Sequence, residues 1–234
     1  MSDTANPPKL ASAAEFDARL KRTDEDRWLA LRYAPAADRE RVASIYLFNQ
    51  ELQRTLQTSE PMLGKIRLQW WRETMEQVAG AGPVRRHDLA EELARVLNGR
   101  PDLHTAAAAL IDRYDDILDD HLHAGGHQPG GDHEARHLAV EGAAMKLAGL
   151  ALDATASAEH LATLAALGEA RIALSAELPQ GAERWRSARQ AAQKLPSALW
   201  PAILHLALAD LPSPQASDFA RRWRLLKTAF THRL

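Results

Sequence analysis

Cysteine is absent from the 234-residue chain, which excludes disulfides and thiolate chemistry. Long apolar segments are absent too: the longest, residues 197–209, is shorter than the roughly 18 residues of a membrane-spanning helix and contains Pro201. Residues 1–10 are polar and lack the apolar core of a signal peptide. The protein is therefore expected to be cytoplasmic.

An excess of basic charge is also missing, because 29 Lys and Arg residues stand against 31 Asp and Glu residues and the formal net charge is −2. This balance argues against nucleic acid as a partner. Runs of β-branched residues are lacking, whereas alanine, leucine, glutamate and arginine are abundant and favour helices. The hydrophobic share of 46% is enough for one large core. The composition predicts an all-α protein.

Glycine and proline divide the chain into about nine or ten expected helices, joined by connections short enough for a single bundle. After a first segment around Trp28, these helices cover residues 38–57, 61–79, 87–98, 102–123, 132–152, 158–178, 181–194, 196–209 and 214–231. Residues 1–12 are expected to form a flexible tail and residues 13–234 a single domain. The glycine-rich segment 124–131 leaves a domain boundary there as the alternative.

Two local patterns support these assignments. Thr23 followed by Asp26 resembles a capping box ahead of the Trp28 segment. In residues 38–57, apolar positions recur at alternating spacings of three and four, so they share one helix face. These positions are Val42, Ile45, Asn49, Leu52 and Leu56.

Several segments, in order, resemble the squalene/phytoene synthase family. They are the apolar segment 26–35 ending in proline, Tyr46-Leu47-Phe48, the tryptophan segment 68–74, residues 110–119, and the Leu-Gly-x-Ala pattern at 167–170. The resemblance covers most of residues 24–178. It implies a helical bundle of the isoprenoid synthase type and, in active members, transfer chemistry on prenyl diphosphates.

One branch of the family fits best. The run from Phe48 to Leu52, residues 67–71 and the segment 188–203 resemble the mitochondrial complex I assembly factor of this family. This resemblance implies a protein partner and, by analogy, a role in respiratory complex I assembly.

Active members carry an Asp-Asp-x-x-Asp motif where this chain has Gln53, Arg54 and Gln57. Carboxylates there would hold Mg²⁺ against a diphosphate, because this ion prefers anionic oxygen ligands. Gln53 and Gln57 are one helical turn apart and are expected to face the bundle interior as hydrogen-bonded or half-buried amides. The alternative is a remodelled pocket in which Arg54 binds a diphosphate directly. Neither a catalytic residue nor a cofactor is expected.

The second aspartate motif should follow Ala170, but the chain reaches Pro179 without an Asp-x-x-x-Asp pattern. The domain is therefore expected to be shortened after about residue 179. Helices uncovered by this loss would leave a residual groove for a lipid, an isoprenoid or a partner helix.

An acidic run is the strongest competing metal signal, since Asp115, Asp116 and Asp119 match Asp-Asp-x-x-Asp literally. In register with the family, however, this run lies on a different helix. We expect solvated, dispensable carboxylates here and keep a Mg²⁺ site as the alternative.

Histidines cluster around the glycine-rich segment: His121, His123, His127, His133 and His137. Residues 133–137 match His-Glu-x-x-His, the zinc protease pattern, but a third ligand is not evident. Adventitious zinc or nickel binding is favoured over catalysis.

Two aromatic features suggest contacts. Trp70 and Trp71 point about 100° apart on a helix, so one of them should meet a pocket, another helix or a partner. The C-terminal helix combines Trp223 with Arg221, Arg222, Arg224 and Lys227. A solvated face is the preferred interpretation of that helix, and peripheral contact with the inner membrane is the alternative.

The sequence thus predicts a non-catalytic assembly or interaction factor built on a synthase fold. A prenyl-diphosphate transferase with unusual catalytic residues is the alternative function, so enzymatic activity is left open.

Overall fold

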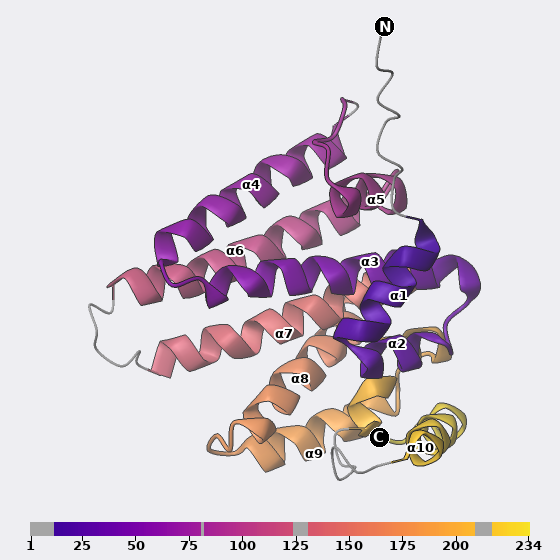
Figure 1. The fold of residues 1–234 in the computed structure, drawn as a ribbon. Helices are drawn as coiled ribbons and strands as arrows, with labels where there is room; N and C mark the ends of the chain where they lie inside the picture. The colour runs from indigo at the N-terminus through magenta and orange to yellow at the C-terminus, as the bar shows by residue number, and fades with distance from the viewer. Residues whose placement is uncertain (1–11, 81, 124–130, 209–216) are drawn as a thin grey trace, which may run out of the picture.

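The computed structural model describes residues 12–80, 82–123, 131–208 and 217–234, and in these ranges all regular structure is helical (Figure 1). The all-α prediction is confirmed. The α-helices are α1 (Ala13–Thr23), α2 (Glu25–Leu31), α3 (Ala36–Gln53), α4 (Pro61–Ala79), α5 (Asp88–Val96), α6 (Pro101–His123), α7 (Gly131–Leu152), α8 (Ala158–Ser175), α9 (Gly181–Ala192) and α10 (Asp218–Thr231). Three 3-10 helices complete the described part: η1 (Arg54–Gln57), η2 (Ser197–Ala202) and η3 (Leu204–Leu208).

The first two helices begin at side-chain caps. Ser12 and Glu15 form a capping box at the start of α1. The capping box expected at Thr23 is wrong, because Thr23 is the last residue of α1 and its hydroxyl donates to the Arg19 carbonyl at 3.0 Å. Asp24 caps α2 instead, since its carboxylate accepts from the Arg27 amide at 3.0 Å.

The long helices lie side by side. In Figure 1, α4, α6, α3 and α7 run roughly along one direction, with α8 and α9 following below α7. Helix α7 contacts α3, α6 and α8, so it is the central helix of the described bundle. The short helices α1 and α2 pack near the end of α3 where that helix begins, whereas α10 lies below them and packs against η3 (Figure 1).

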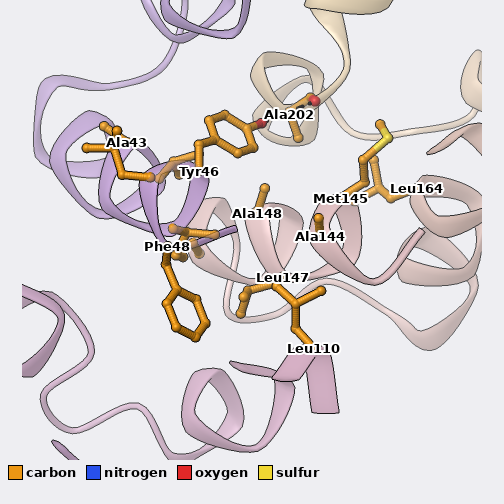
Figure 2. Packing of buried hydrophobic residues seen from close by; sticks show 14 of the residues in the cluster. Ala43, Tyr46, Phe48, Leu110, Ala144, Met145, Leu147, Ala148, Leu164 and Ala202 are labelled. Carbon is orange, nitrogen blue, oxygen red and sulfur yellow. Dashed lines mark hydrogen bonds between the residues drawn. The ribbon is translucent and has the colours of Figure 1, made fainter. Parts of the chain in front are cut away.

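The predicted face of α3 forms part of the core. Val42, Ile45, Asn49 and Leu52 are buried and Leu56 is partly buried, which confirms the spacing argument. Figure 2 shows Tyr46 of α3 pointing towards Ala202, with the small side chain of Ala148 on α7 beside it. The large residues of this core include Phe48, Tyr114 and Trp200.

Helices α7 and α8 approach closely because glycines face the contact. A Cβ atom on Gly168 would lie 2.9 Å from the Glu141 carbonyl oxygen. A Cβ atom on Gly142 would lie 2.8 Å from a carboxylate oxygen of Glu169. The contact requires glycine at position 168, because the Glu141 backbone cannot move aside, whereas a side chain at position 142 would displace the Glu169 carboxylate.

The C-terminal part departs from two predictions. Helix α8 ends at Ser175 rather than near residue 178, and the chain then takes left-handed backbone at Glu177 and Gln180. The expected helix 196–209 is instead the pair η2 and η3 over its described part. Pro201 is the physical reason, because proline lacks an N–H group and its ring blocks a continuing α-helix.

Gly64 of α4 permits the close approach of this helix to η1 and α6, which leads to a stability prediction. A Cβ atom there would lie 2.7 Å from the Thr55 carbonyl oxygen and 2.8 Å from Leu118 Cδ1. We expect Gly64→Ala to lower the free energy of unfolding by about 1–3 kcal/mol through overpacking. Urea denaturation followed by circular dichroism measures this change. Gly82→Ala is the control, since nothing lies within 4 Å of its Cβ position; equal stability of the two variants would refute the packing argument.

Candidate functional site

The positions of the expected aspartate motif lie at the end of α3. Gln53 is the last residue of α3. Helix η1 begins at Arg54 and ends at Gln57. All three side chains are exposed, so the prediction that the two glutamines face the interior is wrong. The chain tightens from 3.6 to about three residues per turn at Arg54, and this places Thr55 in the core instead. The Thr55 hydroxyl donates to the Leu52 carbonyl at 2.6 Å.

Charge at this position does not suit a divalent cation. Arg54 Nη1 lies 2.6 Å from Glu51 Oε1, and Arg19 forms an ion pair with the same carboxylate oxygen. The Glu51 carboxylate beside the motif is therefore already paired with two guanidinium groups. Neutral amides beside cationic groups do not fit Mg²⁺, which requires anionic oxygen ligands.

A hollow of about 390 Å³ opens beside Arg54. It is lined by Glu51, Arg54, Thr55, Arg67, Trp70, Trp71 and His87. Trp71 is buried and meets Phe48 edge-on at 5.2 Å, whereas Trp70 is half-buried and has the Arg85 guanidinium 5.6 Å from its ring centroid. Both tryptophans thus line the hollow, but only Trp71 also belongs to the buried core, in line with the different directions of neighbouring side chains on a helix.

The acidic run of α6 meets α4 through Lys65. The Lys65 ammonium lies 2.8 Å from Asp115 Oδ1 and 2.6 Å from Asp119 Oδ1, and it also donates to the Asp115 carbonyl at 3.2 Å. Burial alone would lower the pKa of Lys65, but its hydrogen bonds with the two aspartates raise the pKa overall. The place between the two carboxylates that a divalent cation would need is thus taken by a protonated amine.

Further basic side chains neutralise the rest of the run. Arg72 of α4 lies 2.9 Å from Asp112 and 3.5 Å from Asp115, and Arg136 of α7 lies 3.0 Å from Asp120. Asp116 is exposed, as expected. The expectation of full solvation is wrong for Asp115, which is half-buried because Lys65 and Arg72 cover it. In the described ranges no group of three or more His, Asp or Glu residues is arranged to hold a metal ion.

The histidine cluster is only partly within the described residues. His121 lies on α6 and His137 lies on α7, and both side chains are half-buried. His127 lies outside the described residues, and His123 and His133 are placed in their helices by backbone alone. The zinc protease interpretation of residues 133–137 therefore stays a prediction without geometric support.

A buried ionic centre, which the sequence reasoning missed, lies between α2, α3 and α7. Arg27 forms an ion pair with Asp24 at 3.1 Å and a second one with Glu141, and its guanidinium lies 5.0 Å from the Tyr46 ring centroid. Burial would lower the pKa of Arg27, but the carboxylates of Glu141 and Asp24 raise it overall. A sequence signal did exist, since Glu141 is the only charged residue in the small and apolar stretch 138–145.

Tyrosine hydroxyls surround this centre. Burial raises the pKa of Tyr46, against the opposing effect of Arg27, and burial also raises the pKa of Tyr114. The Tyr46 hydroxyl donates to the Ala202 carbonyl at 3.4 Å, and the Tyr114 hydroxyl donates to Asn49 Oδ1 at 2.9 Å. Both phenols therefore stay protonated and act as structural hydrogen-bond donors.

An open groove of about 860 Å³ runs between α8 and α9. Its floor consists of small side chains and its rim carries Glu159, Glu169, Glu183 and Arg184. Burial raises the pKa of Glu169 although Arg184 and Arg113 oppose the shift. The expectation that a lost segment after residue 179 leaves a groove for a lipid or a partner stays a prediction.

The acidic run should be dispensable for stability and should not hold Mg²⁺. We expect Asp115→Asn with Asp119→Asn to change the free energy of unfolding by about 1 kcal/mol or less, because partly exposed ion pairs contribute little. Thermal unfolding with and without MgCl₂ measures both properties. Asp112→Asn, whose side chain is 63% exposed, is the control. A melting temperature that Mg²⁺ raises in the unmodified protein but not in the double variant would establish a metal site here.

The model of the squalene/phytoene synthase family matches residues 20–123. This segment extends from the end of α1 to the end of α6 and contains both the altered motif and the acidic run. A search of curated proteins and a search of solved structures gave no match. Residues 20–123 are therefore similar to the squalene/phytoene synthase family.

Proposed function

We propose that this protein is a non-catalytic relative of the squalene/phytoene synthases that acts as an assembly or interaction factor. The observation that carries the proposal is the position of Lys65, whose ammonium lies within 2.8 Å of both Asp115 and Asp119. The acidic run is thereby neutralised by the protein itself. The altered motif offers the amides of Gln53 and Gln57 and no free carboxylate.

Respiratory complex I is the proposed context of this activity. The support is the resemblance of Phe48–Leu52 and of residues 67–71 to the complex I assembly factor of the family. In the structure these segments border the hollow beside Arg54, where Trp70 is available for contact. A protein partner could use this hollow or the groove between α8 and α9, and neither contact requires a metal ion.

The alternative function, a prenyl-diphosphate transferase with unusual residues, has one observation in its favour. Arg54, Arg67 and His87 line the same hollow, and two guanidinium groups can bind a diphosphate without a metal ion. Against it, Arg54 is paired with Glu51.

An assay with farnesyl and geranylgeranyl diphosphate separates the two functions. We expect no Mg²⁺-dependent condensation product from the unmodified protein or from Gln53→Asp with Gln57→Asp, because these exposed positions restore only one side of a two-sided metal clamp. Product extraction and chromatography provide the measurement, with an active squalene/phytoene synthase as the positive control. Turnover that Arg54→Gln abolishes and Arg113→Gln preserves would instead support the transferase.

Deletion of the gene tests the cellular role. We expect the amount of assembled complex I in the host membrane to fall, as measured by native electrophoresis with an in-gel NADH dehydrogenase stain. Complementation with Gln53→Ala should restore assembly, because the proposal gives this position no catalytic role. Normal complex I together with altered isoprenoid lipids in the deletion strain would contradict the proposal.

A further inference from the structure

Helix α10 is attached to the bundle along one side only. Ser217 caps its first turn, and Leu225 and Thr228 are its buried residues. Arg221 fixes the helix to α2 through ion pairs with Glu25 and Asp26, and α10 also packs against η3. These contacts fix the orientation of α10. The side of the helix opposite Leu225 and Thr228 therefore faces away from the bundle.

That outward side carries a continuous apolar stripe, defined here as Phe219, Trp223, Leu226 and Phe230. The four side chains are 75%, 58%, 37% and 82% exposed. Their spacings of four, three and four place them on one helix face, and the rings of Phe219 and Trp223 stack at 6.5 Å between centroids. A contiguous apolar surface of this kind on a charged protein marks an interaction site.

A hollow of about 320 Å³ adjoins the stripe. Leu226 and Phe230 form one wall, and Tyr33, Leu204 and Pro201 belong to the other side. Most lining side chains are apolar, so a hydrocarbon chain can contact them, although Ser197 and His232 are polar.

Basic residues flank the stripe. Arg222, Lys227 and Arg233 are exposed. Residues 217–234 contain five Lys and Arg residues and one acidic residue, Asp218, although the whole chain has a net charge of −2. The positive charge is therefore concentrated where the apolar stripe lies.

An apolar stripe flanked by basic residues favours some partner surfaces over others. A symmetric pair of chains joined through the stripe would bring the same basic side chains towards each other, which like charges disfavour. An anionic bilayer satisfies both features, because aromatic side chains settle at the headgroup level and basic side chains reach the lipid phosphates. In the described part of the chain, no helix combines the length and apolar character needed to cross a bilayer.

We propose that α10 is a membrane-surface anchor that lies in the interface of an anionic bilayer with the Phe219–Trp223–Leu226–Phe230 stripe inserted. The Arg221 ion pairs keep the helix parallel to the surface of the bundle, so insertion requires no rearrangement. Binding is peripheral and depends on salt, since part of it is electrostatic. The inference does not depend on the proposed role in assembly.

Vesicle flotation of the full chain tests the inference. We expect binding to vesicles of phosphatidylcholine mixed with phosphatidylglycerol and much weaker binding to pure phosphatidylcholine. Trp223→Ser with Phe230→Ser should lower partitioning roughly tenfold or more, because two large side chains no longer insert. Arg222→Gln with Lys227→Gln should lower it roughly thirtyfold on anionic vesicles, at about fivefold per basic residue.

Matched control variants remove similar side chains elsewhere. Met62→Ser with Ile66→Ser changes exposed apolar residues of α4, and Arg113→Gln with Lys146→Gln changes exposed basic residues of α6 and α7. Both controls should bind vesicles like the unmodified protein. Circular dichroism verifies that every variant is folded.

Three results would overturn the inference. The first is absence of binding to anionic vesicles by the unmodified protein, and the second is binding that the α10 variants leave unchanged. The third is a dimer, seen by sedimentation without lipid, that Trp223→Ser with Phe230→Ser dissociates, because the stripe would then belong to a second copy. Loss of vesicle binding in the α10 variants would support the anchor. If complex I assembly stays normal in the same variants, the anchor is not required for assembly.

Discussion

The arrangement of the bundle depends on a buried guanidinium. Arg27 on α2 meets Asp24 on its own helix boundary, Glu141 on α7 and the ring of Tyr46 on α3. A cation removed from water is tolerated only when its partners surround it, so three helices must keep their relative positions. Asp24 has a second function as the cap of α2, which couples the start of that helix to the same centre.

The same electrostatic logic explains the outer side of the bundle. Carboxylates that gather on one helix repel each other unless a cation lies between them. In α6 that cation is supplied by the neighbouring helices, through Lys65 and Arg72 of α4 and Arg136 of α7. The acidic run therefore joins α4, α6 and α7 through ion pairs.

Periodic features of this fold could be predicted from the sequence, whereas features set by contacts could not. The buried face of α3 followed from the spacing of Val42, Ile45 and Leu52, because a helix fixes which residues share a side. The exposure of Gln57 did not, because Gln57 lies in the 3-10 helix that follows α3, and Gln53 is exposed at the last position of α3 itself. The partners of Arg27 and Lys65 were equally hidden, since ion pairs between distant segments leave no local pattern. Pro201 is evident in the sequence, but the spacing of apolar residues alone does not show that it divides residues 197–208 into two 3-10 helices.

The close contact between α7 and α8 restricts how this sequence can diverge. Gly168 has no space for an additional carbon atom against the Glu141 backbone, whereas Gln53 and Gln57 face solvent. Mutational drift should therefore change Gln53 and Gln57 first and preserve Gly168 longest. Distant homologues of this protein will be recognised more reliably by the spacing of small residues in α7 and α8 than by any remnant of an aspartate motif.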